Sequence, residues 1–350
     1  MVPLPNDRED PENALSFESA QAPEHKRALA ASPRRRPLVH LLGPFVGLLL
    51  VGVLFTIVAP SGFASLYNAK TIATQSTIVG IAALGMTFVI RSGGIDLSVG
   101  STIALASVAA ALGMEAGLGG LPSILIGVAS GAAVGLLNGT LVTRFKLPPF
   151  IVTLGTLGAA RGTAKWIAGE QKVDAPTGWL AAAMTKNPEP AWLVLAPGVW
   201  VALLCALLAA LVLRRTVFGV WTTAIGSSEP TARLCGVPVE RTKIWIYVLA
   251  GACAGLGGVL QFARLTVGDP TTAVGAELDV IAAVVIGGAS LSGGTGSILG
   301  SVIGALLMGT LSNGCNLSGV PNFVQEILIG AIIVGAVALD GWRTRRRSNE

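Results

Sequence analysis

The sequence predicts an all-α integral membrane protein with about ten transmembrane helices. Hydrophobic residues make up 52% of the 350 residues and charged residues only 12%, against about 25% charged residues in an ordinary soluble domain. The apolar residues gather in runs close to the length of about 20 residues that a helix needs to cross a bilayer core. The 45 glycines fit the same class, because small residues let membrane helices approach closely.

The first 37 residues differ from the rest of the chain. They are rich in Pro, Glu, Asp and Arg and carry no apolar periodicity, which is typical of a disordered segment. Three arginines, 34–36, end this segment directly before the first apolar run. Its length argues against a cleaved signal peptide, so we expect a cytoplasmic tail over 1–37 and a retained first transmembrane helix.

Ten apolar segments follow in order. Two of them, 95–113 and 296–313, begin directly after glycine-rich stretches, and the segment at 278–290 is short. We therefore expect broken or re-entrant backbone near 91–97 and 287–296, and a count of eight or nine spans is the alternative. The predicted spans are 38–58, 70–90, 95–113, 121–142, 150–168, 194–213, 244–264, 278–290, 296–313 and 323–341.

The basic residues orient these spans, because Lys and Arg favour the cytoplasmic side of a membrane. With an even number of spans, the arginines before the first span and those of the tail 343–350 lie on that side together. We predict one transmembrane domain over 38–342, both termini in the cytoplasm, and a long cytoplasmic loop over 214–243. The basic residues lie at segment ends rather than on one face, which argues against nucleic acid as a partner.

The sequence carries no signature of a metal site or an enzyme. The four cysteines are scattered without a Cys-x-x-Cys pair, and the two histidines stand near the amino terminus. Neither a disulfide framework nor a metal site is indicated, and we expect no cofactor.

The 214–243 loop contains one short helix whose ends are marked in the sequence. Ser228 can cap its amino end, and Glu229 suits the positive end of the helix dipole. Pro230 is tolerated in the first turn, and Gly236 fits a left-handed position after the last turn. Two helical turns are not stable alone in water, so the segment is either a docking element or a connector on the membrane surface.

Three motifs of the loop follow in order: Phe218-Gly219, Ala224-Ile225-Gly226, and an Ala-x-x-x-Gly-Val at 232–237. Together they resemble the cytoplasmic coupling loop of the ribose-type (monosaccharide) ABC permease family. Residues 227–230, Ser-Ser-Glu-Pro, depart mildly from a pattern that usually has Asn-Glu and an Ala there. The resemblance implies an ATPase-coupling segment made of Ser228, Glu229, Pro230, Thr231, Ala232, Arg233, Leu234 and Gly236.

Three further stretches resemble the same family: Gly-Gly-Ile-Asp-Leu-Ser-Val-Gly-Ser at 93–101, Pro-Phe-Ile-Val-Thr-Leu-Gly-Thr at 149–156, and Gly-Gly-Ala-Ser-Leu-Ser-Gly-Gly-Thr-Gly-Ser at 287–297. The resemblance covers roughly 40–341. It implies the membrane pathway of a bacterial importer in the cytoplasmic membrane, usually a homodimer. ATP-binding subunits dock on its cytoplasmic loops, and an extracytoplasmic binding protein delivers a sugar such as ribose, xylose or arabinose. The sequence has no Gly-x-x-x-x-Gly-Lys-Ser/Thr phosphate loop, so we expect ATP hydrolysis by a partner.

Asp96 is the strongest candidate for a functional residue at the expected membrane depth, where a carboxylate is costly unless it faces protein or water. It either lines the solute path or serves as a structural carboxylate near the positive end of a helix starting at 95. The pattern Gly-Gly-x-x-Leu-Ser-x-Gly at 93–100 recurs at 287–294, with Ser290 in place of Asp96. The charge is therefore not needed for the turn itself.

Other polar residues on apolar spans are candidates for the solute path, because sugars are recognised through hydrogen bonds. The same residues can instead bond neighbouring helices. Together with Asp96 the candidates are Ser98, Asn138, Thr153, Thr156 and Arg161. Glycines repeated every fourth residue at 127–139, 251–255 and 296–304 predict close helix packing.

Two other classes remain as alternatives to a sugar permease. An ion-coupled secondary transporter also uses broken helices but needs ion or proton ligands, for which Asp96 is the plausibly placed carboxylate. A permease for another small polar solute shares every motif above. A membrane enzyme is disfavoured by the missing metal cluster and nucleophile motif.

Overall fold

The computed structural model describes residues 39–59 and 62–348, and these form a bundle of helices. The predicted tail 1–37 lies outside the described residues. The helices are α2 (Val39–Val58), α3 (Leu66–Arg91), α4 (Val99–Glu115), α5 (Gly120–Arg144), α6 (Pro149–Ile167), η1 (Gly178–Met184), η2 (Ala191–Leu193), α7 (Pro197–Arg215), α8 (Val217–Ser227), α9 (Glu229–Leu234), α10 (Val239–Leu265), α11 (Ala276–Ile286), α12 (Ile298–Leu317) and α13 (Asn322–Ser348).

A helix lies at each of the ten predicted spans, and the main corrections concern the glycine-rich stretches. Helix α4 begins at Val99 rather than at 95, and α11 ends at Ile286 rather than at 290. Residues 92–98 and 287–297 form two non-helical segments, which we call the first break and the second break. At about 1.5 Å per residue, α11 is too short to cross a bilayer core alone. The broken backbone predicted at both places is confirmed.

The lengths and composition of the helices suit a membrane. Among the described residues, α3, α5, α7, α10 and α12 are long and apolar enough to cross one, and α4 is a shorter apolar helix. Helix α13 continues to Ser348, past the expected end of the transmembrane domain at 342. Helices α8 and α9 occupy the long loop between α7 and α10.

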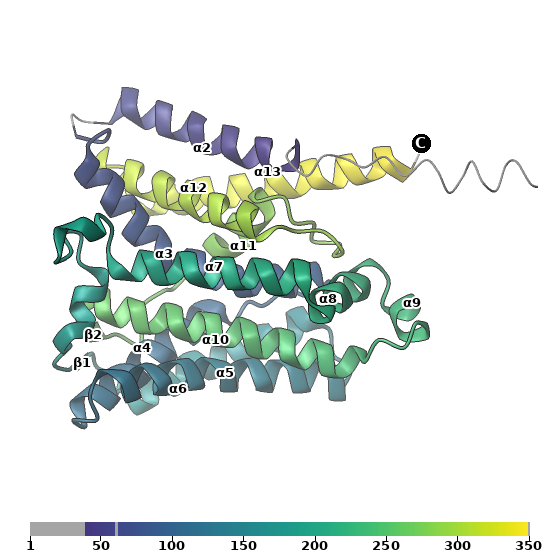
Figure 1. Ribbon diagram of the computed structural model, residues 1–350, viewed down its shortest axis with the longest axis horizontal. Coiled ribbons are helices and arrows are strands. Elements are labelled where there is room, and N and C mark those ends of the chain that lie inside the picture. Colours follow the sequence, from purple (N-terminus) through teal and green to yellow (C-terminus); the bar gives the residue numbers. More distant parts are fainter. Residues whose placement is uncertain (1–38, 60–61, 349–350) are drawn as a thin grey trace, which may run out of the picture. The chain divides into compact units, whose positions relative to one another are not determined.

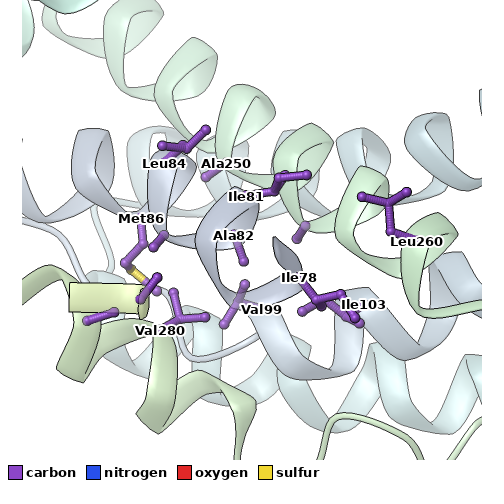
Figure 2. Packing of buried hydrophobic residues seen from close by; sticks show 14 of the residues in the cluster. Ile78, Ile81, Ala82, Leu84, Met86, Val99, Ile103, Ala250, Leu260 and Val280 are labelled. Atoms are coloured by element: carbon purple, nitrogen blue, oxygen red, sulfur yellow. The ribbon is translucent and has the colours of Figure 1, made fainter. Parts of the chain in front are cut away.

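Helix α10 lies at the centre of the bundle and packs against α3, α4 and α5. Figure 2 shows part of the buried core, where Ile81 and Leu84 of α3 lie near Ala250 of α10. Val280 of α11 joins the same core, and Tyr247 of α10 is only 1% exposed. Apolar faces of α3, α10 and α11 are thus buried against one another.

The repeated glycines act as predicted where they lie in helices. A Cβ on Gly131 of α5 would strike the backbone of Gly251 and Gly255 on α10, and a Cβ on Gly304 of α12 would strike Ala283 of α11. These helix pairs therefore touch backbone to backbone. Gly296 is an exception, because it lies in the second break and not in α12.

The two ends of the bundle differ in structure (Figure 1). At one end, β1 (Val173–Asp174) pairs antiparallel with β2 (Val267–Gly268), an interaction that the sequence did not predict. At the opposite end, α8 packs against α7 and α10, and α9 projects from the bundle (Figure 1). The start of α2 and the end of α13 lie at this same end (Figure 1).

Candidate functional site

Helix α9 has the two ends that the sequence predicts. The Ser228 hydroxyl accepts a hydrogen bond from the Thr231 amide at 3.4 Å, and Ser228 itself is extended, with φ −163°. Pro230 lies in the first turn. Gly236 has φ +80°, the left-handed conformation that terminates a helix. The predicted capping is therefore confirmed at both ends.

A small apolar cluster and a set of ion pairs hold α9 in place. Ala232 is 3% exposed and packs with Ile225 of α8 and Val239 of α10. The Glu229 carboxylate accepts hydrogen bonds from Lys243 Nζ at 2.6 Å and from Arg233 Nη2 at 3.1 Å. These contacts fix a helix that is too short to be stable alone.

The charge state of Glu229 follows from the same contacts. Burial disfavours the charged carboxylate, but the hydrogen bonds and positive charges of Lys243 and Arg233 outweigh it and lower the pKa of Glu229. Glu229 is therefore ionised throughout the neutral range, and its ion pairs are lost only in acid, as the pH falls through this lowered pKa.

The outer face of α9 combines exposed apolar and charged groups. Leu234, the last residue of α9, is 89% exposed. With Glu229, Pro230 and Arg233 it lines a shallow hollow. This face therefore presents one apolar side chain surrounded by the ion-paired charges of Glu229 and Arg233.

The first break is held by a buried polar network. Asp96 is 4% exposed, and its Oδ1 accepts hydrogen bonds from the Ser98 amide at 2.8 Å and the Ser98 hydroxyl at 2.6 Å. Asn138 Nδ2 of α5 donates to Ser98 Oγ at 2.9 Å, and the Thr153 hydroxyl of α6 donates to the Ile95 carbonyl at 3.2 Å. Four of the predicted path residues thus meet in one network that ties the break to α5 and α6.

The structural alternative for Asp96 needs a correction. Because α4 begins at Val99, Asp96 does not lie within the first turn of a helix starting at 95. Its carboxylate instead closes a turn inside the break.

Two predicted path residues lie outside this network. The Thr156 hydroxyl donates to the Thr153 carbonyl of its own helix at 3.2 Å. The Arg161 guanidinium donates to the carbonyls of Pro270 and Thr272, at 2.8 Å and 2.6 Å. Arg161 therefore holds the segment that leads into α11.

Several polar groups of the bundle could not be found from the sequence. Tyr247 Oη is buried without a hydrogen-bond partner within the described structure, and a lone tyrosine in an apolar span gives no signal. Glu277 and Asp279 lie in the first turn of α11, so Asp96 is not the one carboxylate inside the helical bundle. The described residues contain no group of three or more His, Cys, Asp or Glu that could hold a metal.

The helical bundle, with its two broken segments and the projecting helix α9, has the architecture expected of a membrane permease subunit. A family model described as "Branched-chain amino acid transport system / permease component" matches residues 68–337. The chain belongs to this family. It is therefore a multi-pass membrane subunit of a transporter and not an enzyme.

Curated relatives are similar over most of their length. The ribose import permease protein of Bacillus subtilis is 41% identical over 85% of this chain and 92% of the relative. The L-arabinose transport system permease protein of Escherichia coli is 38% identical over 81% and 86%, respectively. The fructose import permease protein of Rhizobium meliloti is 37% identical over 85% and 84%. No solved structure matches the chain.

Proposed function

We propose that this chain forms the translocation pathway of a bacterial ABC importer for a monosaccharide. The relatives named above import ribose, arabinose and fructose. Their names support a sugar as the solute, rather than the branched-chain amino acid in the description of the family model. A separate ATPase subunit supplies the energy, and an extracytoplasmic binding protein delivers the solute. Two copies of the chain pair as a homodimer around the path.

The ATPase subunit docks on α9. The observation that carries this proposal is the 89% exposed Leu234 beside the ion pairs of Glu229. A docking partner would cover this apolar side chain, and the ion pairs keep α9 at a fixed angle. The coupling surface comprises Ser228, Glu229, Pro230, Thr231, Ala232, Arg233, Leu234 and Gly236.

The end of the bundle that carries α9 faces the cytoplasm. The start of α2 and the end of α13 lie at this end (Figure 1), which supports two cytoplasmic termini in the bacterial cytoplasmic membrane. Arg91, Arg144, Arg214 and Arg215 end their helices there, as the preference of basic residues for the cytoplasm requires. The transmembrane domain then covers 38–342, with the coupling loop at 214–243.

The buried network of Asp96, Ser98, Asn138 and Thr153 positions the first break beside the solute path. Asp96, Ser98 and Asn138 bond one another and Thr153 bonds the Ile95 carbonyl, so their role is to hold the backbone that shapes the path. Thr156 supports Thr153, and Arg161 positions the segment before α11.

The test replaces Gly236 by Val. Gly236 has φ +80° with no atom near its missing Cβ, so the side chain strains only the backbone, by about 1–2 kcal/mol or more for a branched residue. We expect the variant to insert into the membrane, to lose the co-purifying ATPase and to lose sugar uptake.

Gly117→Val is the matched control. Gly117 follows α4 in the same type of helix end, with φ +75° and open space around it, but it lies at the opposite end of the bundle. This variant should keep the ATPase. An unchanged ATPase complex in Gly236→Val would contradict docking on α9. Uptake that survives ATP depletion while a proton gradient persists would favour an ion-coupled transporter instead.

A further inference from the structure

The last turn of α8 lies against both breaks at once. The Gly294 amide of the second break donates to the Arg91 carbonyl at the end of α3, at 2.9 Å. Gly226 of α8 covers this hydrogen bond so closely that an added Cβ would collide with the Arg91 carbonyl and lie 2.6 Å from the Gly294 nitrogen. Gly293 packs against the Gly226 backbone as well. Three backbone segments therefore meet here without intervening side chains.

The Arg91 side chain joins the same three segments. Its Nε donates to the Thr223 hydroxyl of α8 at 2.8 Å, and its Nη1 donates to the Gly296 carbonyl of the second break. The planar guanidinium suits this task, because its donors point in fixed directions toward two separate acceptors. Arg91 itself is the last residue of α3 and directly precedes the first break.

Helix α8 is coupled rigidly to α9. Ser228 caps the end of α8 and also the start of α9, so one residue joins the two helices. Ile225 and Ala232 pack in one apolar cluster with Val239, which fixes the angle between them. A displacement of α9 must therefore move Gly226.

We propose that Arg91 and Gly226 form a joint that transmits movement of α9 to both breaks together. The inference rests on the proposed docking of the ATPase on α9 and extends it to the residues that carry the movement inward. Closely packed backbone transmits a displacement because it cannot be compressed, and Arg91 keeps the three segments in register. Both are positioning residues that act through the breaks.

The experiment uses the complete importer, with its ATPase and binding protein, in proteoliposomes. Arg91→Ala should keep the ATPase bound and its basal ATP hydrolysis unchanged. Sugar transported per ATP hydrolysed should fall about tenfold, because the variant loses two hydrogen bonds from a charged donor. Arg91→Lys should recover part of the loss, since one ammonium can reach one of the two acceptors.

Thr223→Val provides a second, milder variant. It keeps the shape of the side chain but removes the acceptor for Arg91 Nε, so coupling should fall by a smaller factor. Arg215→Ala is the matched control. It removes an exposed positive charge from the end of α7, at the same end of the bundle as Arg91, and should leave the amount of sugar transported per ATP unchanged.

The outcomes separate the two proposals. If Gly236→Val keeps the ATPase, docking on α9 is wrong. If Gly236→Val loses the ATPase while Arg91→Ala and Thr223→Val both transport normally per ATP, docking stands and the joint is wrong. Loss of the ATPase in Arg91→Ala would also overturn the joint, because Arg91 would then act in docking.

Discussion

The two breaks begin with the same local structure and continue in different surroundings. Each follows a helix that ends in a left-handed glycine, Gly93 with φ +83° and Gly288 with φ +92°. In each, the next amide donates to a carbonyl five residues earlier, at 2.9 Å after α3 and 3.1 Å after α11. This is the common glycine-terminated helix end.

The turns inside the breaks also match. The Ser290 hydroxyl accepts from the Ser292 amide at 3.3 Å, as the Asp96 carboxylate accepts from the Ser98 amide. The sequence repeat pairs Gly93 with Gly287, but the left-handed residue is Gly288. Helix α11 thus ends one residue later than the repeat indicates, although the turn keeps its place.

The surroundings are what differ. Asp96 is buried and its network reaches α5 and α6, whereas the second break is half-buried and is held through the backbone by Arg91 and Gly226. A hydroxyl is enough for the turn, so the carboxyl group of Asp96 serves the buried network that reaches Asn138 through Ser98. The same glycine-terminated helix end and turn can therefore be held in the bundle either by a side-chain network or by backbone contacts.

The largest expected difference is between Asp96→Ala and Ser290→Ala. Removing the Asp96 carboxylate leaves the buried Ser98 amide without its acceptor, which costs about 1–3 kcal/mol of unfolding free energy. Ser290 is partly exposed, so water can replace part of what its hydroxyl bonds, and its loss should cost less, about 0.5–1 kcal/mol. Thermal unfolding of the purified subunit in detergent measures both.

Asp96→Asn sharpens this test, because the amide oxygen still accepts from Ser98 while the carboxyl group is replaced. Equal losses in Asp96→Ala and Ser290→Ala would remove the distinction between the breaks.

Gly93→Ala and Gly288→Ala should have similar effects on stability. Each places a Cβ on a left-handed residue, which costs about 1–2 kcal/mol. Paired unfolding measurements on the two variants check this expectation. A cost confined to one of them would mean that the two helix ends are not equivalent.

A smaller effect than that of Asp96→Ala is expected for Thr153→Val. The substitution keeps the shape but removes the hydrogen bond to the Ile95 carbonyl, at a cost of about 1 kcal/mol. Sugar uptake should fall with it, because the first break loses its tie to α6. A variant with wild-type unfolding temperature and uptake would exclude Thr153 from the network.

The sequence alone determined the class of protein, the positions of the helices and both ends of α9. These features are local: the length of an apolar run reports a membrane helix, and Ser228 and Gly236 act on the backbone of their own helix. The four family motifs also identified the type of permease without any contact being known.

Only the tertiary structure decided which polar residues meet. Arg91 and Thr223 are separated by 132 positions in the chain, and Thr153 and Ile95 by 58. Such pairs depend on how whole helices pack, and the packing is set by the glycine faces and buried side chains of α10 and its neighbours. A hydrogen bond between residues so far apart in the chain leaves no periodic pattern in the sequence. The joint between α8 and the two breaks is therefore visible only in the tertiary structure.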